Sequence, residues 1–89
     1  MKNKNKLLTN LKKTHSLLAK IIKMVEEEKY CIDITQQTLA ASGLLKSAQQ
    51  LLMQDHLNHC FKDAMSSTNE DRKQEMIDEI LHVVDISKR

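Results

Sequence analysis

Two cysteines and one histidine are the residues of this 89-residue sequence best suited to chemistry: Cys31, His56 and Cys60, in the spacing C-x24-H-x3-C. His56 and Cys60 are four residues apart in a segment of helix-forming residues, so a helix would place both on one face. Two thiolates and one imidazole form a soft ligand set that suits Cu(I), or Zn(II) if a fourth ligand joins. Taken singly, each cysteine could equally be a small buried apolar residue.

The elements that must position these residues are helices. The sequence has no proline, one glycine and 2% aromatic residues, which predicts an all-α protein. Apolar periodicity predicts a single domain over residues 1–89, with helices at about 4–28, 33–65 and 69–86. No apolar run approaches the ~20 residues that span a membrane, and the basic N-terminus lacks a signal-peptide core. We therefore expect a cytoplasmic protein.

The apolar positions predict how these helices pack. The first helix has one apolar stripe, interrupted by Thr14: Leu7, Leu8, Leu11, Leu18, Ile21, Ile22 and Val25. The second has a coiled-coil seam with steps of four and three: Ile34, Thr38, Ala41, Leu45, Ala48 and Leu52. It also has a second apolar side, formed by Leu44, Leu51, Leu57 and Phe61. A helix of ~30 residues that is apolar on two sides needs another chain to cover it. Ser67 and Glu70 match a capping box that would begin the third helix, whose apolar face is Met76, Ile77, Ile80, Val83 and Val84.

The length of the second helix separates the candidate ligands. Cys31 lies near one end and the pair His56 and Cys60 near the other, roughly 35–45 Å apart at ~1.5 Å per residue. His59 would point about 100° away from Cys60 and is a poor fourth ligand. Antiparallel pairing of two long helices would bring Cys31 of one chain to the pair on the other. This arrangement predicts a dimer with two identical shared sites.

The charge is distributed unevenly along the chain. Residues 1–25 hold seven lysines and no acidic residue, whereas residues 26–89 hold seven Lys or Arg and all twelve acids. A basic first helix suits a polyanion, although a solvated lysine-rich face would have the same composition. Because aromatic residues that stack on bases are scarce, duplex DNA is favoured over single strands.

Three segments resemble a known family, the CsoR/RcnR/FrmR metal- and stress-sensing repressors: IIKMVEEEKYCIDI, LLMQDHLNHC and QEMIDEIL. The resemblance implies an all-α dimer of dimers with a four-helix-bundle core and a long second helix paired antiparallel. Copper sensors of this family have Cys, His and Cys at the positions of Cys31, His56 and Cys60. The resemblance also implies that Tyr30 and Glu79 couple to the ligand histidine through hydrogen bonds.

The function implied by this resemblance is a Cu(I)-responsive repressor. The metal-free homotetramer would bind operator DNA, and Cu(I) would release it and derepress copper-resistance or efflux genes. Enzymatic activity is not expected, because the sequence shows no nucleophile–base pair, paired carboxylates or phosphate-binding loop.

The first helix departs from the family pattern R-L-x-R-I-x-G-Q, because the corresponding stretch is NLKKTHSL. Asn10 replaces an arginine, and Ser16 and Leu17 replace the Gly-Gln pair; in the second helix Leu39 replaces a serine. Lysine cannot reproduce the bidentate fork of arginine, so these changes weaken the expectation of specific DNA binding.

The DNA-contact candidates that remain are Lys12, Lys13 and Lys46. Two alternatives stay open. One is a copper-binding or buffering protein that has lost specific DNA binding. The other is a persulfide- or thiol-sensing repressor in which Cys31 and Cys60 of neighbouring chains form a bridge; the presence of His56 argues against it.

Overall fold

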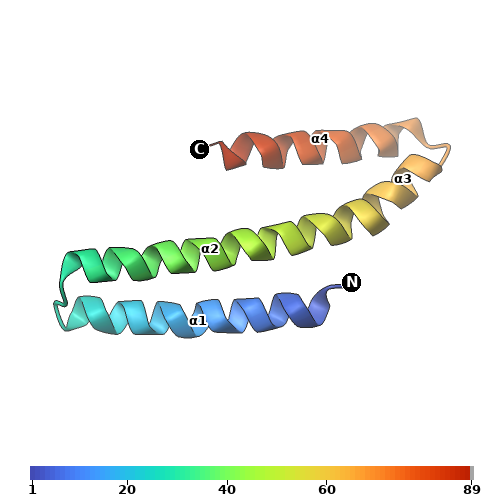
Figure 1. Cartoon of the computed structure of the whole chain (residues 1–89). Coiled ribbons are helices and arrows are strands. Elements are labelled where there is room, and N and C mark those ends of the chain that lie inside the picture. Colours follow the sequence, from blue (N-terminus) through green and yellow to red (C-terminus); the bar gives the residue numbers. More distant parts are fainter. Residues whose placement is uncertain (89) are drawn as a thin grey trace. The chain divides into compact units, whose positions relative to one another are not determined.

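The computed structural model describes residues 1–88, and these form helices joined by short turns (Figure 1). The helices are α1 (Lys4–Glu26), α2 (Cys31–Asp55), the π-helix η1 (His56–Phe61), α3 (Lys62–Ser66) and α4 (Glu70–Ser87). Because α2, η1 and α3 follow one another without a break, they act as one long second helix. The prediction of an all-α chain of three helices with a long second helix is therefore confirmed. None of the helices described is long and apolar enough to cross a membrane.

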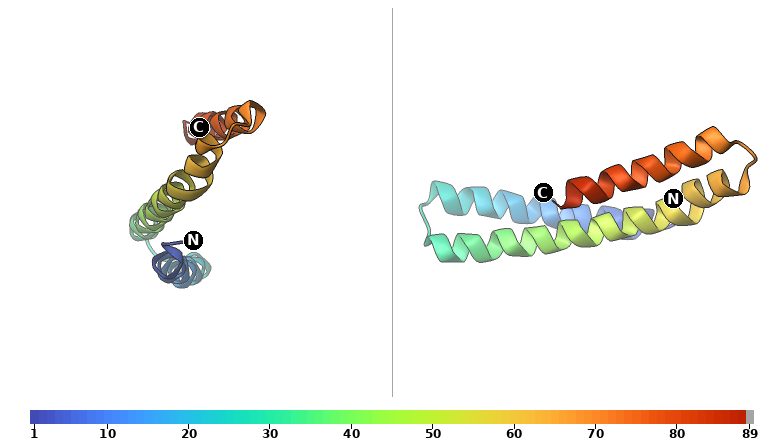
Figure 2. Two further views of the ribbon diagram at one scale, coloured as in Figure 1. Left: turned by 90° about the vertical axis from the view of Figure 1, so that its right-hand side faces the viewer. Right: turned by 90° about the horizontal axis from the view of Figure 1, so that it is seen from above.

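The chain divides into two compact units, Met1–Met53 and the residues from Gln54 on. In the first unit α1 runs antiparallel to α2, and the two helices lie side by side in each view (Figure 2). We call this pair the α1–α2 hairpin. Its inward positions recur in steps of four and three on both helices, which is the heptad pattern of a coiled coil. On α1 they are Leu7, Asn10, Thr14, Leu17, Ile21 and Met24; on α2 they are Ile34, Gln37, Ala41, Leu44, Ala48 and Leu51.

This seam corrects the one expected from the sequence. Ile34, Ala41 and Ala48 do face inward, but three expected seam residues are exposed: Thr38, Leu45 and Leu52. The residues one position earlier, Gln37, Leu44 and Leu51, take their places. Both rows have the same heptad spacing, so periodicity alone cannot show which of them the neighbouring helix covers.

Thr14 occupies the centre of the α1 seam. Its side chain is buried, and its hydroxyl donates a hydrogen bond of 2.9 Å to the backbone oxygen of Asn10, one turn earlier. A buried hydroxyl costs free energy only when it lacks a partner, so this polar residue is accommodated within its own helix. Of the expected α1 stripe, only Leu7 and Ile21 are buried, while five residues are exposed: Leu8, Leu11, Leu18, Ile22 and Val25.

The turn between α1 and α2 fixes the position of Cys31. Glu28 has a positive φ of 52°, and the N–H of Lys29 donates to the oxygen of Met24 at 2.9 Å. Together with the 3.0 Å bond from the N–H of Glu28 to the oxygen of Val25, this is a Schellman ending. The carbonyl of Tyr30 then accepts hydrogen bonds from the backbone N–H groups of Asp33 and Ile34, one turn later, so Cys31 becomes the first residue of α2.

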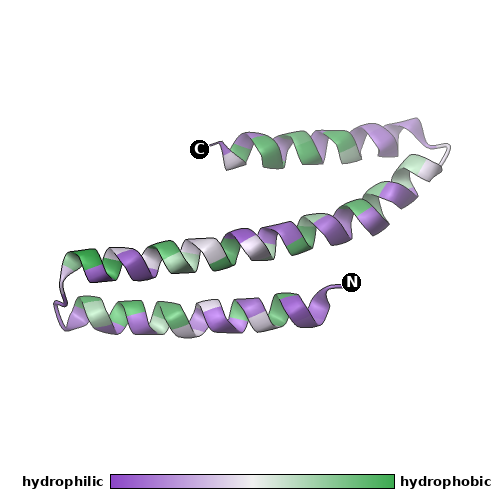
Figure 3. Ribbon diagram, in the orientation of Figure 1, coloured by the Kyte–Doolittle hydropathy of each residue, from purple (hydrophilic) through white to green (hydrophobic). Residues whose placement is uncertain are grey.

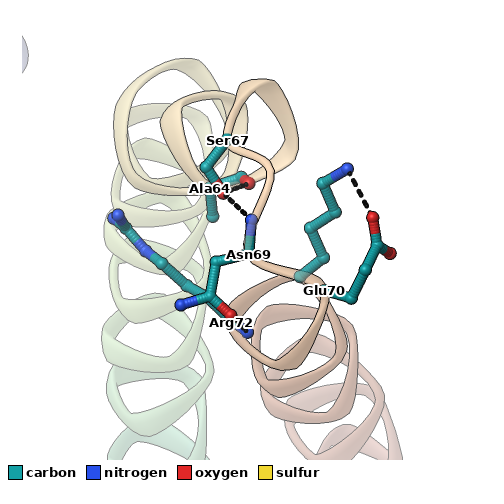
Figure 4. Close-up of polar contacts among 6 residues, drawn as sticks. Ala64, Ser67, Asn69, Glu70 and Arg72 are labelled. Atoms are coloured by element: carbon teal, nitrogen blue, oxygen red, sulfur yellow. Dashed lines mark hydrogen bonds and ion pairs between the residues drawn. The ribbon is translucent and has the colours of Figure 1, made fainter.

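In the second unit, Asn69 is the N-cap of α4 (Figure 4). The Asn69 side-chain oxygen accepts from the N–H of Arg72 at 3.1 Å. Ser67 instead ends α3, because its hydroxyl donates to the oxygen of Ala64 at 2.7 Å. The expected capping box of Ser67 and Glu70 is therefore wrong. Asparagine is as good an N-cap as serine and stands directly before the helix, which leaves Ser67 free to close the preceding one.

Gly43 lies in the middle of α2 and has no packing role within the chain, because a Cβ there would meet nothing within 4 Å. We expect Gly43→Ala to raise the free energy of unfolding by about 0.5–1 kcal/mol, since alanine loses less backbone entropy on folding. Urea unfolding followed by circular dichroism would measure the change. The converse variant at the exposed neighbour, Ala40→Gly, should lower stability by a similar amount. A destabilising Gly43→Ala would instead show that another chain packs closely against this position.

Candidate metal site

His56 and Cys60 lie on η1, where the helix widens into a π turn. The backbone hydrogen bonds of a π-helix join residues i and i+5, so each turn takes up more residues than a turn of α-helix. Residues four apart are therefore separated by about one turn, as they are in an α-helix. His56 is half-buried and Cys60 is an exposed free thiol. The π turn thus contains both an imidazole and an exposed thiol.

The sequence analysis missed this π turn and expected a regular helix through residue 65. The segment HLNHCF contains no glycine or proline that would mark a helix irregularity. Single π turns are rare and occur frequently at functional sites. The local distortion therefore coincides with the two residues that were selected for their chemistry alone.

Cys31 is the first residue of α2 and is also an exposed free thiol. Its backbone oxygen accepts a 2.8 Å hydrogen bond from the hydroxyl of Thr35. This bond stabilises the first turn of the helix and does not involve the sulfur. The N-terminal end of a helix stabilises negative charge, and this suits a thiolate ligand. Tyr30, the residue before it, is 67% exposed.

Two of the three candidate ligands, His56 and Cys60, belong to the same π turn, whereas all of α2 separates Cys31 from His56. Within residues 1–88 no group of three or more His, Cys, Asp or Glu side chains is placed to hold a metal ion. The donor types nevertheless fit a soft metal, because both thiols are free and exposed. The predicted set of three ligands would be complete only if a second thiol reached His56 and Cys60.

Glu79 lies on the exposed surface of α4, in an acidic stretch of that helix. Together with Glu75, Asp78 and His82 it lines a shallow hollow of about 370 Å³. The side-chain amide of Gln74 donates to Asp78 at 2.9 Å. The expected roles of Tyr30 and Glu79 beside the ligand histidine stay predictions.

The three expected DNA-contact residues, Lys12, Lys13 and Lys46, are all exposed. Two of the positions that depart from the family pattern have a packing role instead. Asn10 and Leu17 are half-buried in the seam of the α1–α2 hairpin. Ser16 is exposed, and Leu39 is 66% exposed.

Fold and site together define an all-α protein with a lysine-rich first helix and a long second helix that carries a candidate metal-binding pair. Residues 3–85 match the family model described as "Metal-sensitive transcriptional repressor". The chain belongs to this family, which comprises transcriptional repressors and not enzymes. The family resemblance noted in the sequence is thereby confirmed.

Individual relatives agree with this assignment. The copper-sensing transcriptional repressor CsoR of Bacillus subtilis (strain 168) is 33% identical over 82 residues, which cover 92% of this chain and 78% of the relative. The protein of the same name from Mycobacterium ulcerans (strain Agy99) is 33% identical over 81 residues, covering 91% and 67%. The crystal structure of the copper-sensing repressor CsoR with Cu(I) from Geobacillus thermodenitrificans NG80-2 superposes with a TM-score of 0.85 at 27% identity, covering 99% of this chain and 88% of that one.

Proposed function

We propose that this metal-sensitive repressor responds to Cu(I). The metal-free form binds operator DNA, and Cu(I) binding weakens that affinity and derepresses genes for copper resistance or efflux. The observation that supports the proposal is that His56 and Cys60 lie four residues apart within one π turn and that the Cys60 thiol is free and exposed. The names of the relatives, copper-sensing repressors at 33% identity, support the same metal. We also propose a cytoplasmic location, because the operator is reached there.

The proposed ligands are Cys31, His56 and Cys60. Two sulfur donors and one nitrogen donor suit Cu(I), which accepts low coordination numbers and soft ligands. Because His56 and Cys60 belong to one turn while Cys31 begins α2, we propose that the second thiol comes from a neighbouring copy of the chain. Tyr30 and Glu79 would orient the imidazole of His56 through hydrogen bonds, as outer partners of metal-binding histidines commonly do.

One side of the α1–α2 hairpin supports such an assembly. The two seam positions of each heptad are a and d. In an antiparallel helix pair the e positions, which directly follow d, lie on the same side of both helices. These residues and their neighbours on α1 form what we call the apolar side: Leu8, Leu11, Leu18, Ile22 and Val25 of α1, with Leu45 and Leu52 of α2. Their exposed fractions range from 40% to 59%. Figure 3 shows apolar residues, in green, alternating with polar ones, in purple, along the ribbon of α1.

The gathering of these exposed apolar residues on one side of the hairpin supports the same conclusion, because contiguous apolar surface on a protein commonly marks a protein–protein interface. We therefore propose a dimer whose core is a four-helix bundle formed by two apolar sides.

A second interface is supported by α4, five of whose apolar residues are also exposed. They are Ile77, Leu81, Val83, Val84 and Ile86. We propose that this surface joins two dimers into a homotetramer.

For DNA, the proposed contacts are Lys12, Lys13 and Lys46, which are exposed and would neutralise phosphates. Because the two ligands act on one equilibrium, DNA must weaken Cu(I) binding by the same factor by which Cu(I) weakens DNA binding. Such coupling is typically 5- to 150-fold, or about 1–3 kcal/mol.

A second candidate function is a copper-binding protein that has lost operator recognition. The specific observation in its favour is that Leu17, which replaces the glutamine of the family pattern, is apolar and half-buried in the hairpin seam. A side chain that packs between helices is withdrawn from DNA. No arginine stands on α1 or α2 to provide a bidentate contact with a base or phosphate.

Fluorescence anisotropy with duplex DNA distinguishes the two functions. Fragments from upstream of the copper-resistance genes of the same genome are titrated with metal-free protein, beside a scrambled duplex, in a salt series. For a repressor we expect binding at least about 10³-fold tighter to one fragment than to the scrambled duplex, and at least fivefold weaker binding with Cu(I). Equal affinity for every duplex, with no response to Cu(I), would establish the copper-binding alternative.

A further inference from the structure

The α1–α2 hairpin has a second side, opposite the apolar side, and lysines form a row along it. The residues directly before the first seam position of each α1 heptad are Lys6, Lys13 and Lys20, which we call the lysine row. They recur every seven residues, so neighbours are roughly 10 Å apart along the helix axis. All three are exposed.

A hollow between the helices lies at the N-terminal end of this row. It has a volume of about 350 Å³. One apolar residue of α2, Leu44, lines it together with five residues of α1: Asn5, Lys6, Thr9, Asn10 and Lys13. Two ammonium groups, two amides and one hydroxyl therefore border one concave surface. Amide, hydroxyl and ammonium groups are the donors that proteins use for the oxygens of DNA phosphates and sugars.

The positive charge of the row is not neutralised within the described part of the chain. The ion pairs in the described part of the chain involve other lysines: Glu27 pairs with Lys23 and Lys29, and Glu70 pairs with Lys73. No acidic residue occurs before Glu26. On the same side, α2 presents small or uncharged residues near its middle, namely Ala40, Gly43 and Ser47. The lysines thus project from a surface that leaves room for a bulky polyanion.

We propose that the lysine row and its hollow bind the phosphate backbone of duplex DNA, and that this surface faces away from the self-association interface; the inference rests on the proposed function as a DNA-binding repressor. Lys6 and Lys20 join Lys13 as phosphate contacts. Because lysine acts as a point charge, these contacts add affinity on any sequence and do not read bases. The absence of aromatic residues from residues 1–29 excludes base stacking as the source of affinity there.

The test is the salt dependence of duplex binding by the full-length protein, measured by anisotropy for Lys6→Gln and Lys20→Gln. Each phosphate contact adds about 0.9 to the slope of log affinity against log salt concentration. We expect each variant to lower the slope by about that amount for every lysine copy on the DNA. Affinity should fall by the same factor on operator and scrambled duplexes. Lys62→Gln, which removes an equal charge from an exposed position on α3, should leave the slope unchanged.

The outcomes separate this inference from the proposed function. Wild-type slopes in Lys6→Gln and Lys20→Gln, with wild-type protein binding DNA normally, would overturn the lysine row. A fall in affinity on the operator alone would also overturn it, because that result requires base readout. If the wild-type protein bound all duplexes equally and ignored Cu(I), the proposed function would fail, yet lower slopes in the two variants would still establish the row.

Discussion

Mixing two inactive variants, Cys31→Ser and Cys60→Ser, should restore Cu(I) binding. Each variant alone lacks one ligand in both sites of the dimer, and we expect its Cu(I) affinity to fall by more than about 100-fold, beyond the loss typical of an outer-shell change. In a mixed dimer, one shared site receives Cys31 from the Cys60→Ser chain and the intact pair of His56 and Cys60 from the other chain. Random pairing makes half the dimers mixed, so about a quarter of all sites should recover. Anaerobic competition with a Cu(I) chelator would count them.

The matched control mixes Cys60→Ser with His56→Ala. Both changes damage the same half of the site, so every mixed dimer still has a defect in each site and no recovery is expected. Failure of the first mixture to recover would show that the ligands are not shared between chains. X-ray absorption on wild-type protein supplies an independent check, because two sulfur ligands and one nitrogen are expected. A site with sulfur ligands alone would remove His56 from the set.

Leu18→Glu should abolish self-association. Leu18 is 45% exposed in the single chain, and a surface substitution would change stability by only about 0.5 kcal/mol. If the apolar side forms the dimer core, however, the variant buries two unpaired carboxylates, one from each chain. The cost of several kcal/mol raises the dimer dissociation constant by more than about 100-fold. Sedimentation equilibrium over a range of protein concentrations would measure this.

Ser16→Glu provides the comparison for Leu18→Glu. Ser16 lies two residues away on the same helix and is exposed, but it belongs to the side of the hairpin that carries the lysine row. The oligomeric state of this variant should match that of the wild-type protein. Dissociation by Ser16→Glu, with an intact assembly in Leu18→Glu, would place the interface on the opposite side of the hairpin.

The sequence predicted the helices well because their causes are local. The lack of proline, the single glycine and the heptad spacing establish an all-α chain with a long second helix. The inward side of that helix could not be predicted. Thr38, Leu45 and Leu52 have the same spacing as Gln37, Leu44 and Leu51, and only the position of α1 decides between them. The choice of Asn69 over Ser67 as the cap of α4 likewise depends on where α3 ends.

For the candidate site, too, the sequence predicted what depends on residue type and spacing, but not what depends on the local backbone or on helix packing. Residue type and spacing were enough to select Cys31, His56 and Cys60, because ligand chemistry is a property of side chains. The π turn that contains His56 and Cys60 has no marker in the sequence. The lysine row was also missed. The sequence shows the sevenfold spacing of Lys6, Lys13 and Lys20, but the side of the hairpin that they occupy depends on the orientation of α1 on α2.

The π turn also has a consequence for residue numbering. Ala41, Ala48 and Asp55 are buried at intervals of seven, and this row ends where η1 begins at His56. A π turn accommodates one residue more than the α-helical turn it replaces. Heptad positions assigned before His56 therefore do not carry through to residues after Phe61. Sequence alignments and designed variants of this chain should restart the heptad register after residue 61, and deletion of one residue within η1 should be tolerated better than deletion within α2.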